Sequence, residues 1–328
     1  MKTILVTGGA GYIGSHTCKA LAQAGYMPVS YDNLIYGHPW AVKWGPLIEG
    51  NILNRAQLDK AIEQYKPSAV MHFAAFAYVG ESVHEPAKYY RNNVAGSLTL
   101  LEAMLEHGID KFIFSSTCAT YGVPLQIPIT EEHPRQPINP YGRSKLMVER
   151  IMQDFYRAYS LRFIALRYFN AAGADEAGEV GKDHDPETHP IPLALDVAAG
   201  RRENITVFGS DYDTEDGTCI RDYIHVTDLA DAHVLALQAL ENGAESTAYN
   251  LGNGQGFSVQ QVIDTARLVT GREIPAIIGE GRPGDPSRLI GNADRISKNL
   301  GWSPSYPDLE SIIQTAWYWH QKHFSKFY

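Results

Sequence analysis

The sequence predicts an α/β protein with a doubly wound parallel sheet and a smaller α/β lobe in the C-terminal half. Three observations predict this fold. Short apolar runs alternate with longer helical patterns, a glycine-rich turn joins the first run to the first helix, and the pattern changes after Asn170. Strands that are apolar throughout are typical of a parallel sheet, because helices cover both of its faces.

The elements follow one another in the order that such a sheet requires. Strands are expected at residues 4–6, 28–31, 69–73, 111–114 and 162–166. Long helices are expected at residues 14–24, 92–106 and 144–159. The second half adds a helix at 193–199, a strand at 205–208 and a helix at 227–240.

Composition excludes several classes of protein. The chain has 328 residues, is 44% hydrophobic and carries a formal net charge of −9, which is unfavourable for general binding to nucleic acid or to an anionic membrane. The three cysteines, Cys18, Cys118 and Cys219, show no C-x-x-C spacing, so neither a disulfide framework nor a metal site is expected. No signal peptide or membrane span is visible, and we expect a soluble, cytoplasmic protein.

The glycine-rich turn carries the first functional prediction. Gly8, Gly11 and Gly14 follow the first strand and open the first helix. They allow a tight turn, a close approach of the backbone to a pyrophosphate, and close packing of the helix on the strand. The helix N-terminus then offers N–H groups to the phosphates. This context indicates a Rossmann-like dinucleotide site.

Asp32 indicates which dinucleotide binds. It ends the second strand, where a carboxylate accepts hydrogen bonds from the adenosine ribose and repels a 2′-phosphate, so NAD is favoured over NADP. The alternative is an Asx turn into Asn33. Further residues after the third and fourth strands are expected to border the cofactor: Asn51, Ile52, Phe73, Ala74 and Ala75.

The composition of residues 171–190, which are rich in Gly, Asp, Glu, His and Pro, predicts a long loop and a domain boundary. We expect residues 1–170 to form the NAD-binding domain and residues 171–328 to form the substrate lobe. Segments around 221–251 are expected to rejoin the first domain.

Tyr141 and Lys145 are the candidate catalytic pair. They are four residues apart in a predicted helix and therefore share one face. A nearby ammonium and a positive nicotinamide ring both favour the phenolate, so Tyr141 is expected to act as a base. Thr117 lies at a strand end where ligands bind, and it is expected to hydrogen-bond the substrate. For Ser115 and Ser116, the alternative is turn and cap chemistry.

Longer motifs extend these observations. They are GGAGYIGSHT at 8–17, VGESV at 79–83, YYRNNV at 89–94, FSSTCATYG at 114–122, NPYGRSKLMVE at 139–149, LRYFNAAGA at 166–174, DGTCIRDYIHVTDLADAH at 216–233 and RPGD at 282–285. In these motifs the chain resembles the extended short-chain dehydrogenase/reductase family and, within it, the UDP-glucose (UDP-galactose) 4-epimerases.

The resemblance implies an isomerase of galactose and carbohydrate metabolism. Tyr141 takes the proton of the sugar C4 hydroxyl while hydride moves to NAD, the 4-keto sugar rotates, and hydride returns to the opposite face. Cofactor positions implied in addition are Tyr12, Ile13, Asn33, Asn92, Ser115 and Phe169. Positions implied for the UDP-sugar are Asn170, Phe208, Arg221, Tyr223, Val259, Arg282 and Asp285.

Arg221 and Arg282 would supply the positive charge that the acidic chain otherwise lacks, since guanidinium groups suit phosphate oxygens. The alternative is ion pairing with Asp222 or Asp285. The resemblance also implies a homodimer formed by the helices at 92–106 and 144–159, and the alternative is that each helix only covers its own sheet.

Four positions depart from the family pattern. Ala77 stands where the family often has Lys, and Asn51 where many relatives have Asp. His189 and the following Pro replace an Asn-Leu or His-Leu pair that helps to hold the diphosphate. Leu289 replaces a common Tyr and leaves room for an N-acetyl group.

Several activities therefore remain open. The sugar could be a UDP-hexose, a UDP-N-acetylhexosamine or the UDP-xylose/UDP-arabinose pair. A nucleotide-sugar 4,6-dehydratase needs an acid and a base after the catalytic Thr, where this chain has Cys118 and Ala119. A dehydrogenase that releases its reduced cofactor and a non-catalytic NAD-binding protein would also fit the dinucleotide site.

Overall fold

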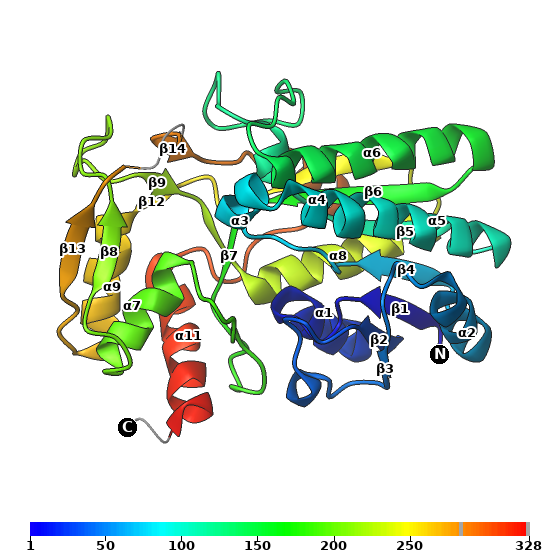
Figure 1. Ribbon diagram of the computed structural model, residues 1–328, viewed down its shortest axis with the longest axis horizontal. Coiled ribbons are helices and arrows are strands. Elements are labelled where there is room, and N and C mark those ends of the chain that lie inside the picture. The colour runs from blue at the N-terminus through cyan, green and yellow to red at the C-terminus, as the bar shows by residue number, and fades with distance from the viewer. Residues whose placement is uncertain (282–284, 326–328) are drawn as a thin grey trace.

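The computed structural model describes residues 1–281 and 285–325 and confirms the α/β class with a Rossmann-like parallel sheet. The main sheet has seven strands in the order β11-β6-β5-β4-β1-β2-β3, and all of its neighbours pair in parallel (Figure 1). Its strands are β1 (Thr3–Thr7), β2 (Met27–Asp32), β3 (Leu47–Glu49), β4 (Ala69–His72), β5 (Lys111–Thr117), β6 (Arg162–Tyr168) and β11 (Thr247–Leu251).

Helices cover both faces of this sheet because the side chains of each strand alternate between two cores. Ile4 and Val6 face one core and Leu5 faces the other. The first core includes α1 (Tyr12–Gln23), α8 (Val226–Glu241) and α10 (Asp294–Leu300). The second includes α2 (Arg55–Tyr65), α5 (Gly96–Glu106) and α6 (Pro140–Tyr159).

The strand order reverses at β1, which lies between β2 and β4. The connections that leave the carboxyl ends of β1 and β4 run to opposite sides of the sheet, and such a switch point leaves a crevice where ligands bind. The glycine turn after β1 and residues 73–75 after β4 border this crevice. Short elements near the sheet are η1 (Pro39–Ala41), α3 (Val79–His84), α4 (Pro86–Tyr89), the π-helix η2 (Tyr90–Ala95) and η3 (Cys118–Thr120).

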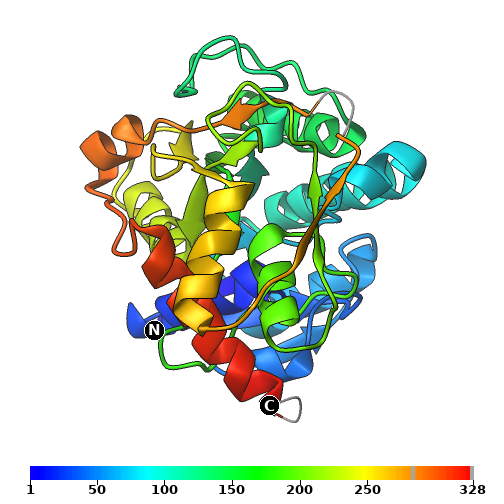
Figure 2. The ribbon, with the colours of Figure 1, turned by 90° about the vertical axis from the view of Figure 1, so that its left-hand side faces the viewer.

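The smaller lobe has its own core beside the carboxyl edge of the sheet. Its helices α7 (Pro190–Ala198), α9 (Val259–Thr270) and α11 (Leu309–His323) face the viewer in Figure 2. Its strands form small sheets: β8 (Ile205–Phe208), β13 (Ala276–Gly279), β9 (Ile220–Arg221), β12 (Phe257–Ser258) and β14 (Arg288–Leu289).

The chain crosses between the two lobes more than once. β7 (Asn170–Ala172) pairs with β10 (Tyr223–His225), after which α8 packs on β5 and β6 and β11 extends the main sheet. Residues 173–189 between β7 and α7 contain no regular helix or strand. Within the described residues, no helix combines the length and the hydropathy needed to cross a bilayer.

Two predicted helices differ from the structure in informative ways. The helix expected at 92–106 is a π-helix followed by α5, so its first turn is wider than an α-helix allows. The helix expected at 144–159 begins at Pro140, because the side chain of Asn139 accepts the N–H of Gly142 and proline is favourable at the first helical position. Tyr141 therefore lies in the first turn of α6.

Candidate active site

The glycine turn packs so tightly that side chains would not fit. Gly8 has a φ of +75°, and its N–H donates to the Tyr31 carbonyl at 2.8 Å. A Cβ atom at Gly14 would lie 2.1 Å from the carbonyl oxygen of Gly8. Gly11 caps the N-terminus of α1, whose first N–H groups have no partner inside the helix. This cradle fits the pyrophosphate of a dinucleotide.

Asp32 supports the same turn from the end of β2. One carboxylate oxygen accepts the N–H of Ala10 at 3.0 Å, and the other accepts the N–H of Leu34 at 2.9 Å. The second contact is an Asx-type turn, as the alternative interpretation expected. The carboxyl group is buried, and burial raises its pKa while these backbone N–H groups oppose the rise. A ribose hydroxyl could add a further partner.

The other predicted cofactor residues lie at neighbouring strand ends. The N–H groups of Phe73 and Ala74 both donate to the carbonyl of Thr7, at 2.8 and 3.1 Å, which ties the end of β4 to the start of the glycine turn. Asn51 follows β3, and its side-chain oxygen accepts the N–H of Leu53 at 2.9 Å. Ile52 is 3% exposed and belongs to a hydrophobic core.

Tyr12 and Asn33 extend this border. The hydroxyl of Tyr12 donates to the Gly173 carbonyl at 2.6 Å and so connects the first turn of α1 to the loop after β7. The side chain of Asn33 accepts the N–H of Ile35 at 3.2 Å. Ile13 packs against the first core, and Ala75 is partly buried after β4.

Asn92 lies in the π-helix beside a residue that sequence reasoning missed. The Asn92 amide donates to Oδ1 of Asn93 at 3.0 Å. Asn93 in turn holds the backbone of Phe76 through both its oxygen and its nitrogen, at 2.9 Å each, and donates to the Ser144 hydroxyl at 3.1 Å. The adjacent Asn-Asn pair within a helical pattern was the available signal, because asparagine is unfavourable inside a helix.

The structure brings Thr117 and Tyr141 together. Thr117 ends β5, and its side chain lies close enough to the Tyr141 phenol to lower its pKa and also accepts the N–H of Ala119 at 3.1 Å. Burial raises the pKa of Tyr141 to about 12, the Thr117 hydrogen bond lowers it, and Cys118 raises it. Of the protein groups that affect this pKa, Thr117 is the one that lowers it and so favours the phenolate. The sequence had suggested the Lys145 ammonium for this role.

Lys145 lies one turn further along α6. Its ammonium nitrogen donates to the Ser115 carbonyl at 2.8 Å and lies 4.9 Å from the centre of the Phe114 ring. The side chain is 3% exposed, and burial lowers its pKa to about 7. The hydroxyl of Ser115 is hydrogen-bonded to the hydroxyl of Tyr168. Ser115 therefore contacts Lys145 through its carbonyl and the next strand through its side chain.

Arg221 and Asp285 form an ion pair in this structure. A guanidinium nitrogen lies 2.6 Å from a carboxylate oxygen, and the other terminal nitrogen donates to the carbonyls of Ile220 and Pro286. This pairing is the alternative that the sequence left open for Arg221. Burial raises the pKa of the Cys118 thiol, and the positive charge of Arg221 opposes that rise. Arg282 lies outside the described residues.

Four predicted residues line one cavity between the two lobes, and they are Tyr12, Asn170, His189 and Tyr223. Asn170 and Tyr223 pair across β7 and β10. The Tyr223 hydroxyl is buried and has no hydrogen-bond partner among the described residues. His189 caps α7, and both its backbone N–H and its ring contact Glu187, at 2.7 and 3.0 Å. Proline follows it at the first helical position, so that position offers no N–H to a ligand.

The remaining predicted residues lie at the end of β6 and over the edge of the smaller lobe. Phe169 packs in a cluster with Tyr121 and Ile129, and Leu289 packs against that cluster. Phe208 ends β8 with 41% of its surface exposed, and Val259 begins α9 with its N–H donating to Cys219. No group of three or more His, Cys, Asp or Glu side chains in residues 1–281 and 285–325 could hold a metal ion.

Comparison with known families agrees with this geometry. The family model described as the NAD dependent epimerase/dehydratase family matches residues 4–252, which span the sheet, the glycine turn and the Tyr141/Lys145 helix. The chain belongs to this family. NAD is therefore its cofactor, and the cradle at Gly8–Gly14 together with Asp32 fits that molecule.

Individual relatives of the family are similar over nearly the whole chain. A UDP-glucose 4-epimerase of Rhizobium meliloti is 55% identical over 98% of this chain and 98% of its own length. A crystal structure of the UDP-glucose 4-epimerase from Brucella ovis in complex with NAD is 53% identical, with a TM-score of 0.95 over 99% of this chain and 98% of that one. A Stenotrophomonas maltophila UDP-glucose-4-epimerase with bound NAD and formylated UDP-arabinopyranose is 38% identical, with a TM-score of 0.95 and 99% coverage of both chains.

One more group near the candidate catalytic pair was missed in the sequence. Glu149, one helical turn after Lys145, forms a buried ion pair with Arg167, and Ser116 donates to the same carboxylate. The signal was spacing, because Glu149 follows Lys145 by the four residues that separate Lys145 from Tyr141.

Proposed function

We propose that the chain is an isomerase that catalyses the NAD-dependent, reversible 4-epimerisation of a UDP-sugar, with UDP-glucose and UDP-galactose as its pair. The observation that carries the proposal is the buried Lys145 ammonium, which donates to the Ser115 carbonyl one helical turn from Tyr141, with the Thr117 side chain close enough to that phenol to lower its pKa. The similarity to UDP-glucose 4-epimerases over nearly the whole chain supports the same activity.

The chemistry follows from these three side chains. NAD held at the glycine turn would supply the acceptor and donor of the hydride at the sugar C4 carbon, and its positive ring would favour ionisation of the nearby phenol. Tyr141 removes the proton of the C4 hydroxyl and later gives it back, while Thr117 hydrogen-bonds to that hydroxyl. Lys145, which is held on the Ser115 carbonyl, keeps a proton donor beside the phenol and the cofactor ribose.

The residues after Thr117 favour epimerisation over dehydration. A 4,6-dehydratase needs an acid and a base near the sugar C5 and C6 carbons, whereas this chain has Cys118 and Ala119 there. Burial raises the pKa of the Cys118 thiol to about 12, so the thiol holds its proton and is a poor acid or base near neutral pH.

We further propose that the smaller lobe binds the UDP part of the substrate. The residues assigned to this role are Thr117, Asn170, His189, Phe208, Arg221, Tyr223, Val259, Asp285 and Leu289, together with Arg282. The buried Tyr223 hydroxyl without a partner among the described residues and the pairing of the Arg221 guanidinium with Asp285 support this assignment. When the substrate binds, the Arg221 guanidinium would leave Asp285 and bind phosphate oxygens, which suit its planar set of N–H donors.

We also propose which domain binds NAD and which binds the UDP-sugar. Residues 1–170 with the segments around 221–251 would form the NAD-binding domain, and the rest of residues 171–328 the UDP-sugar lobe. The return of α8 and β11 to the main sheet supports this division.

We assign a second set of residues to the binding of NAD. Those residues are Gly8, Gly11, Tyr12, Ile13, Gly14, Asp32, Asn33, Asn51, Ile52, Phe73, Ala74, Ala75, Asn92, Ser115, Tyr141, Lys145 and Phe169. Their position around the crevice at the switch point of the sheet supports the assignment.

Turnover of three substrates tests the activity and the choice of sugar. We expect UDP-galactose to give the highest kcat/KM, with UDP-N-acetylgalactosamine and UDP-arabinopyranose accepted less well. The pentose only lacks the C6 hydroxymethyl group, and a small missing group costs about 10- to 200-fold in kcat/KM. The products are separated by anion-exchange chromatography while absorbance at 340 nm is followed.

Two outcomes would contradict the proposal. Failure of all three sugars to give a 4-epimer would exclude the activity. A steady rise at 340 nm in step with product would indicate a dehydrogenase that releases its reduced cofactor.

We also propose a homodimer that forms through α5 and α6. Val148 and Met152 of α6 are buried on its own sheet, yet α6 also exposes 41% of Met147, 43% of Tyr156 and 59% of Tyr159. A second copy would cover these apolar and aromatic side chains. Light scattering should give twice the 36.3 kDa of one chain, and a monomer at micromolar concentration would contradict the proposal.

A further inference from the structure

Three consecutive residues of β5 contact α6 at intervals of one helical turn. The Thr117 side chain lies close enough to the Tyr141 phenol to lower its pKa, the Ser115 carbonyl accepts a hydrogen bond from Lys145 at 2.8 Å, and the Ser116 hydroxyl donates to Glu149 at 2.6 Å. Positions 141, 145 and 149 lie on one face of the helix. The first two contacts involve the catalytic pair, whereas the third involves side chains with no part in the chemistry.

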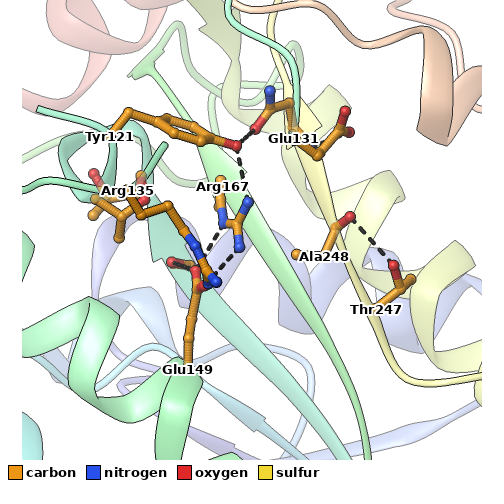
Figure 3. A network of polar contacts seen from close by, with 11 residues as sticks. Tyr121, Glu131, Arg135, Glu149, Arg167, Thr247 and Ala248 are labelled. Atoms are coloured by element: carbon orange, nitrogen blue, oxygen red, sulfur yellow. Dashed lines mark hydrogen bonds and ion pairs between the residues drawn. The ribbon is translucent and has the colours of Figure 1, made fainter. Parts of the chain in front are cut away.

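The Glu149 carboxylate is held more firmly than either catalytic side chain. It is 2% exposed, and its two oxygens accept hydrogen bonds from Nε and a terminal nitrogen of Arg167 at 2.9 and 2.7 Å. Arg135 adds a contact at 2.9 Å from the rim. Figure 3 shows the guanidinium of Arg167 between this carboxylate and the phenol of Tyr121. The paired geometry restricts Glu149 in both distance and orientation.

The contacts of Arg167 extend this group to the far strand of the sheet. Another nitrogen of Arg167 donates to the Tyr121 hydroxyl at 2.9 Å, and that hydroxyl donates to Asn250 of β11 at 2.6 Å. The Asn250 amide donates to the Ile129 carbonyl at 2.9 Å. Glu149 is therefore tied to β5, β6 and β11 together, which are adjacent strands of the rigid sheet.

The charges around Glu149 indicate that it affects the active site by positioning α6 and not through its own charge. Burial raises the pKa of Glu149, but Arg167, Ser116 and Arg135 together lower it below its usual value, so the carboxylate is charged near neutral pH. The lowered pKa of Lys145 has burial as its cause, with no contribution from Glu149. A buried ion pair is weak evidence for stability, because desolvation offsets much of its attraction. The role that remains for the Glu149–Arg167 pair is to hold α6 in one position on the sheet.

We propose that Glu149 is a positioning residue, which through Ser116 and Arg167 sets the register of α6 along β5 and so holds the Tyr141 phenol at the Thr117 hydroxyl. The inference rests on the proposed function, since its effect is measured on that reaction. An α-helix rises about 1.5 Å per residue, so even a partial slip would separate the phenol from its partner. Misplacement by about 1 Å can cost on the order of 100-fold in rate.

Glu149→Gln tests the proposal with little change in volume. The amide group faces the donors of Arg167, so the paired contact is lost. We expect kcat for UDP-galactose to fall about 10- to 100-fold, with KM within about threefold of wild type and NAD content unchanged. The Thr117 hydrogen bond lowers the pKa of Tyr141, so weakening it raises that pKa. The rise of kcat with pH should therefore move to higher pH.

Ser116→Ala is the second variant and keeps the Glu149–Arg167 pair intact. It removes only the connection between the carboxylate and β5, so it should move kcat and the pH profile in the same direction by a smaller amount. It also keeps the proposal testable if Glu149→Gln does not fold. Asp154→Asn is the matched control, because Asp154 is an acidic residue of the same helix that is 76% exposed and paired with Arg157.

The outcomes separate this inference from the proposed function. If wild type interconverts the two sugars but Glu149→Gln and Ser116→Ala keep its kcat and pH profile and only melt at lower temperature, Glu149 is merely structural and the inference is wrong. If wild type does not act on UDP-galactose, it is the proposed function that fails.

Discussion

Replacing Tyr141 with Phe is expected to lower kcat for UDP-galactose by about 10²- to 10⁴-fold, the usual contribution of a positioned acid or base. Phe keeps the ring and removes only the hydroxyl that contacts Thr117. The protein should still fold and retain NAD, because the glycine turn and Asp32 do not depend on that hydroxyl. Turnover is followed by chromatography of the two UDP-sugars, and NAD is measured after denaturation.

Tyr318→Phe is the matched control for this substitution. Tyr318 is a helical tyrosine of α11 that is 50% exposed and belongs to neither ligand site, so its variant should keep wild-type turnover. Turnover of Tyr141→Phe within about threefold of wild type would refute the role of Tyr141 as the base. Loss of NAD from the variant would show that the hydroxyl matters for binding instead.

Replacing Gly14 with Ala is expected to abolish both NAD binding and turnover. The new Cβ atom would lie 2.1 Å from the Gly8 carbonyl oxygen and 2.9 Å from its carbonyl carbon, and backbone atoms cannot move aside as a flexible side chain does. Either α1 moves away from β1 or the turn opens, and overpacking of this kind typically costs about 1–3 kcal/mol. NAD retained per chain should fall at least about tenfold, which corresponds to about 1.4 kcal/mol of binding free energy.

Gly80→Ala is the matched control for Gly14→Ala. Gly80 lies in α3, where a Cβ atom would meet nothing within 4 Å, so this variant should keep its NAD and its turnover. Both variants are compared by NAD content after gel filtration and by thermal unfolding. Wild-type NAD content in Gly14→Ala would show that the tight contact between turn and helix is not what creates the cofactor cradle.

The parts that sequence could predict depend on neighbours along the chain. Gly8, Gly11 and Gly14 lie within one turn and one helix start, so their spacing alone predicts a tight backbone and a dinucleotide site. Tyr141 and Lys145 share a helix face because of the period of the α-helix, whatever surrounds them. The alternation of apolar strands with helical patterns likewise predicted the parallel sheet that the structure contains.

The parts that sequence could not predict depend on residues far apart along the chain. The pairing of Arg221 with Asp285 joins residues separated by 64 positions, and the sequence left it as an open alternative. The pKa of Tyr141 rises because of burial and is lowered by Thr117, whereas helical spacing had suggested Lys145. Burial and distant partners decide such properties, and neither is visible in a local pattern.

The sequence by itself therefore determined the fold class, the cofactor cradle and the identity of the candidate catalytic pair, because each depends on local geometry. Only the tertiary structure decided how the pair is held. It brings Thr117, Ser115 and Ser116 of β5 against three successive turns of α6, and it connects Glu149 to Arg167 across the sheet. The physical reason is that packing sets the register between a strand and a helix, whereas spacing within either element cannot.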